Sequence, residues 1–331
     1  MSSQTEPDMP SLRKTHRGII SIISMGDMGA GIARLLTAHN YAVLTNVSDR
    51  SEDTKSRAVS AGALLVSDDS LLLEADLILS IVPPAEALGT AKRIISASSS
   101  LQQEKTLPVY VDLNAVSPKT SKLIAEMFAG SGIEYLDGAI LGHPPSFSID
   151  NDSWTVPLLP ISGLVESFLL EFKEVFALLN TKYLGEEVGK ASSLKMVFAT
   201  LSKGYAAIAL QSVVTASRLG VLEELKSSVK EVQGEGEVRR LERIVTCLPP
   251  KAGRWVREME EIGDTHEIEG GWLKDAGIFR GAAEVFRIVA EDTELGREKV
   301  DKRKRGLTVE DVGLVVGEGL ERKGEDERKK G

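Results

Sequence analysis

A strand that turns directly into a helix through glycines is the feature that most constrains how this chain can fold. The segment from Gly18 to Leu36 opens with the β-branched apolar run Ile19 to Ile23, and a helical repeat of apolar residues follows Gly29. Glycines let the backbone of such a turn approach a ligand, and the N–H groups and dipole at a helix start attract anions. The segment therefore predicts a turn that holds a diphosphate. The expected contacts are Ser24, Met25, Gly26, Asp27, Met28 and Gly29.

The turn departs at one position from the Gly-x-Gly-x-x-Gly pattern of dinucleotide-binding sites. Ser24 stands where the first glycine is expected, whereas Gly26 and Gly29 occupy the other two positions. The glycine pair alone is also compatible with an ordinary strand-to-helix turn. The interpretation as a nucleotide site therefore depends on the rest of the chain.

Composition limits the kinds of protein that this chain can be. Its 331 residues are 42% hydrophobic and 27% charged, which is typical of a globular protein and long enough for two domains. The net charge of −9 argues against nucleic acid as a partner, because phosphate backbones attract basic surfaces. The single cysteine excludes an intramolecular disulfide framework and a cysteine-rich metal site, which predicts no metal and favours a cytoplasmic location. Residues 1–15 lack the apolar core of a secretory signal and are expected to be a disordered lead-in.

The order of apolar runs predicts an α/β fold. From residue 16 to residue 188, strand runs alternate with helical stretches, which is typical of a Rossmann-type parallel sheet with extra strands, covered on both faces. We expect residues 16–188 to form an NAD(P)-binding domain. After the first strand, the expected strands are Tyr41 to Val47, Ala63 to Val66, Leu77 to Val82, Val109 to Leu113, Glu134 to Ala139 and Pro157 to Ser162, and another begins at Tyr183.

A long helix is predicted where this alternation stops, at Gly189. Lys190 to Leu219 has the length and pattern of one helix of about thirty residues, or about 45 Å. Lys195, Lys203 and Gln211 within it argue against a membrane span. So long a helix, poor in charge, is expected to lie between domains and to support a homodimer.

The remainder of the chain is predicted to be all-α. Residues 189–290 are expected to form a helical substrate and dimerisation domain built on the long helix, which completes the predicted architecture of a Rossmann-type sheet followed by an all-α domain. Residues 291–331 are dense in charge and are expected to be a disordered, solvated tail.

The residues after the second predicted strand are expected to select the cofactor. An acidic residue at this place binds the 2′-hydroxyl of NAD, whereas an arginine beside a hydroxyl group accommodates the 2′-phosphate of NADP. The chain offers both, because Asp49 is followed by Arg50 and Ser51. If the strand ends early, Asn46 takes the ribose-facing place and Arg50 with Ser51 binds the phosphate. We favour this arrangement, which predicts NADP, and NAD is the alternative.

Two further strand ends carry candidate contacts, because ligands of open parallel sheets bind at the carboxyl ends of the strands. Val82, Pro83 and Pro84 close one strand with rigid residues against which a flat ring could lie. Asn114 follows the next strand and is a candidate for a polar contact to the nicotinamide or to substrate. An asparagine at such a place can also cap a helix.

Five motifs in order resemble the β-hydroxyacid dehydrogenases and 6-phosphogluconate dehydrogenase-like proteins. The resemblance covers residues 18–290. The helical half, with Lys203-Gly204 and Arg254 to Ile262, is most similar to a branch whose second domain has no assigned substrate. The motifs are the glycine turn with Met28, Val82-Pro83-Pro84, the turn from Asp112 to Pro118, the segment from Asp137 to Pro145 and the lysine helix after Gly189.

The resemblance implies a nicotinamide-dependent dehydrogenase in which a lysine on the interdomain helix is the general acid or base. Lys195 occupies that position. Oxidation of an alcohol releases a hydroxyl proton, and a lysine can accept it when burial and nearby positive charge lower its pKa. The implied reaction is hydride transfer between the cofactor and a small hydroxy acid or a related carbonyl compound.

The substrate contacts depart from the family pattern. The asparagine that the family carries one turn after the lysine is Ala199 here, and the usual serine and glycine contacts are altered, which leaves the substrate open. Two alternatives stay open as well, a cofactor-binding sensor or oligomer partner without turnover and an imine reductase-like enzyme. The candidate substrate contacts are Asn114, Gly142, His143 and Lys203.

Overall fold

The computed structural model describes residues 6–99, 106–274, 277–298 and 302–330. Its contacts divide the chain into two compact units, Met1–Met196 and Val197–Gly331. The division falls a few residues beyond the boundary that the sequence predicted, inside the long helix. Each unit is described by itself.

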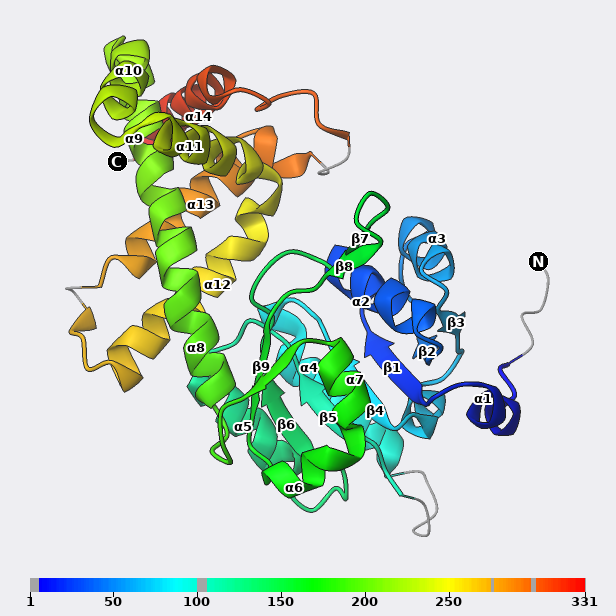
Figure 1. Ribbon diagram of the computed structural model, residues 1–331. Coiled ribbons are helices and arrows are strands. Elements are labelled where there is room, and N and C mark those ends of the chain that lie inside the picture. Colours follow the sequence, from blue (N-terminus) through cyan, green and yellow to red (C-terminus); the bar gives the residue numbers. More distant parts are fainter. Residues whose placement is uncertain (1–5, 100–105, 275–276, 299–301, 331) are drawn as a thin grey trace. The chain divides into compact units, whose positions relative to one another are not determined.

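The first unit is built on an eight-stranded sheet with the strand order β10-β9-β6-β5-β4-β1-β2-β3 (Figure 1). The strands predicted before residue 163 are present, with ends one or two residues shorter in most cases, but the last strand, Thr181–Tyr183, ends at the residue where it was expected to begin. Neighbouring strands from β3 to β6 run parallel, as expected. The strands are β1 Ile19–Ile23, β2 Ala42–Thr45, β3 Leu64–Leu65, β4 Leu77–Ser80, β5 Val109–Asp112, β6 Tyr135–Gly138, β9 Leu159–Ser162 and β10 Thr181–Tyr183.

One edge of the sheet differs from the parallel arrangement that the sequence predicted, because β9 pairs with β6 in the antiparallel direction. The chain reaches β9 through the hairpin of β7 Ser146–Ser148 and β8 Ser153–Thr155 instead of a crossover helix, so its direction reverses. The sequence did not predict this hairpin, because its strands are only three residues long each and are partly exposed.

Helices cover both faces of the sheet and bury two apolar layers. Alternate residues of β1 enter different layers, because successive side chains of a strand point to opposite faces. Ile20 and Ile22 pack in the layer that includes α2 and α7, whereas Ile19 and Ile23 pack in the layer that includes α4 and α5. The helices of this unit are α1 Met9–Thr15, α2 Asp27–Ala38, α3 Glu52–Ser60, α4 Ala87–Ser98, α5 Pro118–Phe128, α6 Glu166–Leu169 and α7 Lys173–Leu178.

The lead-in is more ordered than the sequence predicted. Met9–Thr15 forms α1, and the side chain of Met9 is buried against the sheet layer that includes α4. Residues 1–5 of the predicted disordered segment lie outside the described residues.

The long helix that the sequence predicted is present as one continuous helical run from Lys190 to Leu219. It consists of α8 Lys190–Ala199, a π-helical segment Thr200–Gly204 and α9 Tyr205–Leu219. By length and composition the run could cross a membrane, but 50% of its most apolar window is buried inside the protein, as in the core helix of a globular domain.

The second unit is all-helical, as predicted. Helices α12 and α13 pack on each other, and α9 packs against α11, α13 and α14 (Figure 1). Its helices after α9 are α10 Leu222–Gln233, α11 Glu235–Cys247, α12 Ala252–Asp264, α13 Phe279–Asp292 and α14 Val309–Lys330.

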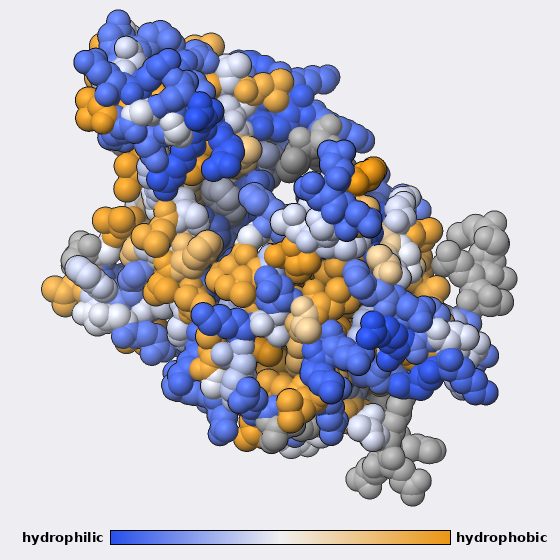
Figure 2. All heavy atoms as spheres, in the orientation of Figure 1, coloured by the Kyte–Doolittle hydropathy of each residue, from blue (hydrophilic) through white to orange (hydrophobic). Residues whose placement is uncertain are grey.

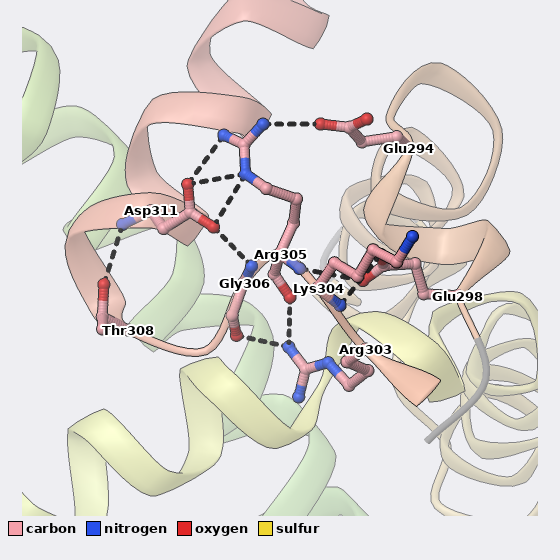
Figure 3. Close-up of polar contacts among 8 residues, drawn as sticks. All are labelled: Glu294, Glu298, Arg303, Lys304, Arg305, Gly306, Thr308 and Asp311. Atoms are coloured by element: carbon pink, nitrogen blue, oxygen red, sulfur yellow. Dashed lines mark hydrogen bonds and ion pairs between the residues drawn. The ribbon is translucent and has the colours of Figure 1, made fainter. Parts of the chain in front are cut away.

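The predicted disordered tail corresponds in the structure to an ordered connection and helix α14. Val312, Val315 and Val316 are buried, and α14 packs along α9. Several of the charges that suggested a solvated tail form ion pairs, some with one another and others with the rest of the second unit. The guanidinium of Arg305 donates to both carboxylate oxygens of Asp311 at 2.7 to 3.1 Å (Figure 3). Residues 299–301 and 331 of the tail lie outside the described residues.

Candidate cofactor and active site

The turn after β1 has the geometry of a phosphate-binding turn. Ser24 adopts a φ of 79°, a conformation that favours glycine, which explains why the fingerprint has a glycine at this place. A Cβ at Gly29 would lie 2.2 Å from the carbonyl oxygen of Ser24, so only glycine allows the helix to start this close to the strand. Helix α2 begins at Asp27 without a side-chain cap, and the space above Gly26 is open. The uncapped N–H groups fit a diphosphate.

The side chains of the turn contribute less to this site than its backbone. Met25 is fully buried, and Met28 packs against the core. Asp27 is exposed, and its carboxylate lies 3.9 Å from Arg57 of α3. The Arg57 guanidinium also donates to the carbonyl oxygen of Met25 at 3.1 Å. Arg57 is thus a cation held against the turn, and sequence analysis missed it because α3 follows a different strand.

The residues after β2 form a polar turn at the same edge of the sheet. The carboxamide of Asn46 donates to Asp69 at 2.8 Å and accepts from Ser48, so it holds the turn together. Ser51 caps α3 by accepting from the N–H of Thr54. The strand ends at Thr45, which is the early end on which the NADP prediction depended.

Arg50 lies beside acidic groups in this turn. Its guanidinium lies 3.4 Å from Asp49 and 3.1 Å from Glu86, and all three side chains are at least one-third exposed. Exposed ion pairs of this kind contribute at most about 1 kcal/mol, so the guanidinium can exchange partners for an anionic ligand.

The ends of β4 and β5 are tied together by Asn114, whose side chain is almost completely buried. Its carboxamide oxygen accepts from the N–H of Val82 at 2.7 Å, and its nitrogen donates to Ser80 at 3.1 Å. Pro83 is exposed beside this link, whereas Pro84 is buried. The predicted role of Asn114 as a cofactor or substrate contact stays a prediction, and its observed role is to join two strand ends.

Asp112, at the end of β5, is a buried acid with an incomplete set of partners. One carboxylate oxygen accepts from the N–H of Asn114 at 2.8 Å, and the other has no hydrogen-bond partner among the described residues. Burial raises the pKa of Asp112 to about 7.

The amine of Lys195 lies at the carboxyl end of β6. Its Nζ donates to the carbonyl oxygen of Ile140 at 2.6 Å, and the side chain is partly buried. Ile140 follows β6 by two residues, and β6 runs parallel to β1 through β5 and β4. The amine is therefore at the same edge of the sheet as the glycine turn, about three strand spacings or roughly 14 Å along it.

Asp137 of β6 is a fully buried carboxylate at the start of α8. The sequence analysis quoted this residue only as the beginning of a family motif, and its partners are far away in the sequence. Its carboxylate accepts from the N–H groups of Gly189, Ala191 and Ser192 at 2.9 to 3.1 Å and from the hydroxyls of Ser121, Ser162 and Ser192 at 2.5 to 2.9 Å.

The loop after β6 carries two of the candidate substrate contacts. Gly142 and His143 are both exposed, and Gly142 has a φ of 136° that favours glycine. The loop continues into Pro144 and Pro145, and a Cβ at Gly31 of α2 would lie 3.0 to 3.2 Å from these prolines. The loop is therefore held against the same helix that starts at the glycine turn.

Lys203 belongs to the second unit, where it is buried and paired. Its ammonium donates to Glu258 of α12 and lies 5.9 Å from the centre of the Trp255 ring. Arg254 reaches the other oxygen of Glu258 at 3.2 Å. Ala199, which replaces the family asparagine, is buried. Within the described part of the chain, no group of three or more His, Cys, Asp or Glu residues could hold a metal ion.

Comparison with known families matches both halves of the chain. Residues 19–145 match the NAD binding domain of 6-phosphogluconate dehydrogenase, and residues 216–289 match a domain of unknown function, DUF1932. The first match confirms the predicted NAD-binding domain and its resemblance to the 6-phosphogluconate dehydrogenase type. More particularly, the chain joins this NAD-binding domain to a domain that matches DUF1932, to which no function is assigned.

Individual relatives share this fold at low sequence identity. An uncharacterised 28.5 kDa protein of Methanothermus fervidus is 28% identical over 252 residues, which cover 76% of this chain and 89% of that protein. A conserved hypothetical protein of Sinorhizobium meliloti is 23% identical with a TM-score of 0.57, covering 91% of this chain and 96% of that one. The 3-hydroxyisobutyrate dehydrogenase of Salmonella typhimurium is 14% identical with a TM-score of 0.62, and the match covers 89% of this chain and 98% of that one.

Proposed function

We propose that the protein is an NADP-dependent oxidoreductase that transfers a hydride between the nicotinamide and a small hydroxy acid or a related carbonyl compound. The observation that carries the proposal is the amine of Lys195 at the carboxyl end of β6, on the sheet edge that also bears the uncapped start of α2. Ligands of parallel sheets bind at this edge. When bound there, the nicotinamide ring accepts or donates the hydride.

Lys195 is proposed to hold and move the proton of the reacting oxygen. As a neutral amine it accepts the hydroxyl proton during oxidation, and as an ammonium it returns a proton to the carbonyl oxygen during reduction. The carbonyl of Ile140 orients the amine through the 2.6 Å hydrogen bond. The exposed Gly142 and His143 follow in the same loop and are proposed to contact the substrate.

The residues around the glycine turn are proposed to hold the cofactor and to select NADP. The backbone from Ser24 to Gly29 supplies N–H groups to the diphosphate, and Val82 with Pro83 lies against the ring. Arg50 and Ser51 bind the 2′-phosphate, because β2 ends before Asn46 and leaves Arg50 exposed at the turn. Arg57 adds a positive charge next to Met25. If Asp49 binds the ribose instead, NAD is preferred.

Cofactor selection is tested by titrating the protein with NADPH and with NADH and following binding by fluorescence. We expect Arg50→Ala to weaken NADPH binding by about tenfold and to leave NADH binding within about twofold, because the guanidinium meets only the 2′-phosphate. Arg34→Ala, on the exposed side of α2, is the matched control and should change neither affinity. Unchanged NADPH affinity in Arg50→Ala would show that the assignment to the 2′-phosphate is wrong.

The general acid or base is tested by turnover with NADP⁺ and a panel of 3-hydroxy acids, and in reverse with NADPH and the corresponding carbonyl compounds. Lys195→Ala should lower turnover by about 10² to 10⁴-fold and leave cofactor affinity within about twofold. Lys190→Ala, one turn earlier on the same helix and paired with Glu187, should retain full turnover.

Three outcomes would contradict this function. A wild-type protein that binds NADPH tightly but turns over none of the panel would favour the alternative of a sensor or oligomer partner. The observation that favours this alternative is Ala199, which stands where the family carries an asparagine. Reduction of cyclic imines alone would favour the imine reductase-like alternative. Lys195→Ala with wild-type turnover would remove the lysine from the mechanism.

The protein is further proposed to be cytoplasmic and to form a homodimer through its second unit. The prediction that Lys203 contacts the substrate stays a prediction, and its observed partner is Glu258 of the same unit. Several side chains of the long helix are apolar and exposed, namely Val197, Phe198, Leu201 and Ile208, and Figure 2 shows apolar atoms along the visible side of this helix. Exposed apolar stripes of this kind are typical of subunit interfaces.

A further inference from the structure

We propose that Asp137 is a positioning residue that fixes the start of α8 on the end of β6 and thereby holds the amine of Lys195 in its place. The proposal deepens the proposed function, on which its relevance to turnover rests. The attachment itself is a property of the first unit and can be measured without a substrate.

The first step concerns how the buried charge of Asp137 is stabilised. Its six donors are N–H or hydroxyl groups, and three of them are the N–H groups of Gly189, Ala191 and Ser192 at the start of α8. A helix start carries about half a positive charge, so the carboxylate and the helix stabilise each other. The strength of this attachment depends on the negative charge of Asp137 and not only on its shape.

The second step concerns the distance from Asp137 to Lys195 along both elements. Asp137 and Ile140 lie three residues apart at the end of β6, and Ser192 and Lys195 lie three residues apart on α8. Asp137 binds Ser192, and the carbonyl of Ile140 binds Lys195 at 2.6 Å. Strand end and helix are therefore joined at two consecutive points. Residues three apart in a helix lie on the same side of it. A displacement of Ser192 from Asp137 therefore also moves the amine of Lys195 away from the carbonyl of Ile140.

The third step concerns the amide variant of Asp137. Asparagine keeps the shape and one acceptor oxygen, and the hydroxyls of Ser121 and Ser192 can turn to accept from its NH₂ group. The substitution removes the negative charge that attracts the helix start. Asp137→Asn therefore isolates the effect of charge from the effect of packing.

The experiment measures the rate at which acetic anhydride labels Lys195, followed by peptide mass spectrometry across pH. In Asp137→Asn we expect labelling of Lys195 to accelerate by about three- to tenfold at neutral pH, because the hydrogen bond from the amine to Ile140 opens more often and exposes the amine to the reagent. The amides of Ala191 and Ser192 should exchange hydrogen at least about tenfold faster. Asp76→Asn is the matched control, since Asp76 also accepts a backbone N–H, that of Ile19 at 2.8 Å, but at the amino end of β4.

The proposal is supported when labelling and exchange change in Asp137→Asn and stay at wild-type values in Asp76→Asn. It is overturned if folded Asp137→Asn labels Lys195 at the wild-type rate. If that variant does not fold, Ser162→Ala replaces it. The Ser162 hydroxyl donates at 2.9 Å to the Asp137 oxygen that also accepts the three N–H groups at the start of α8. Ser162→Ala should accelerate labelling by about two- to threefold, and an unchanged rate also overturns the proposal.

Turnover separates this inference from the proposed function. If Lys195 is the general acid or base, Asp137→Asn should lower kcat by about tenfold and shift the pH profile, with little change in cofactor affinity. If Lys195→Ala retains activity, the proposed function fails, whereas the labelling experiment still decides whether Asp137 holds the amine.

Discussion

Ser24 shows how a single residue can depart from a motif while the backbone keeps the geometry that the motif requires. Its φ of 79° is the conformation that glycine adopts at little steric cost, and a serine there costs about 1–2 kcal/mol. Gly29 has no such freedom, because a Cβ would meet the carbonyl of Ser24. The sequence could show which position departs, but only the coordinates show that the turn is retained.

Asp112 predicts a measurable dependence of stability on pH. Its pKa is about 7 in the folded protein and about 3.9 in the unfolded chain, so the folded state binds the proton more tightly. The stabilisation by this proton is complete below about pH 4 and is lost as the pH rises through 7. Between about pH 5 and pH 8, the free energy of unfolding should fall by about 2 to 3 kcal/mol more in the wild type than in Asp112→Asn.

Urea unfolding at several pH values, followed by circular dichroism, measures this difference. Asp112→Asn is the reference for the wild type, because the two proteins share all other titrating groups. Parallel pH curves for wild type and Asp112→Asn would contradict the assignment of a raised pKa to this carboxyl group.

At the scale of elements, α14 explains why a charge-dense segment is not a disordered tail. Three polar contacts gather before its start, where Arg305 bridges Asp311 and Glu294 and the N–H of Gly306 donates to Asp311 at 2.5 Å (Figure 3). These contacts hold the segment so that the valines of α14 can be buried. Composition alone does not reveal that the charges pair within the segment.

We expect Asp311→Asn to lower the free energy of unfolding of the second unit by about 1–2 kcal/mol, because it removes the charge from a forked, partly buried pair with Arg305. Chemical denaturation measures the change, and hydrogen exchange should show α14 loosened first. Glu325→Gln, at an exposed position of the same helix, should have no effect beyond about 0.5 kcal/mol. Equal stability of the two variants would mean that the pair does not hold the helix.

At the scale of the whole molecule, the proposed homodimer depends on the exposed apolar side of the long helix. Leu201 is 75% exposed and Val232 of α10 is 80% exposed, so neither contributes much to the stability of the folded chain. We expect Leu201→Glu to weaken dimerisation by at least about 100-fold, because a charge cannot be buried in an apolar interface.

Sedimentation equilibrium measures this effect across a range of protein concentrations. Val232→Glu is the matched control and should leave the association unchanged. A wild-type chain that remains monomeric at high concentration, or a Leu201→Glu variant that associates as the wild type does, would contradict a dimer formed by this side of the helix.

The elements whose signals are local could be predicted from the sequence. The apolar runs of β1, β4 and β5, the glycine turn before α2 and the helical run from Lys190 to Leu219 are each specified by residues that are neighbours in the chain. Strand propensity, glycine geometry and helical periodicity act over a few residues, so they can be recognised without the fold.

Contacts between residues far apart in the chain were decided only by the tertiary structure. Asp137 meets the start of α8 more than fifty residues later, and Lys203 meets Glu258 at a separation of 55 residues. The reversal of β9 and the docking of α14 on α9 are of the same kind. Nothing in the local pattern selects such partners, because buried charges find their partners only when packing brings distant elements together and excludes water.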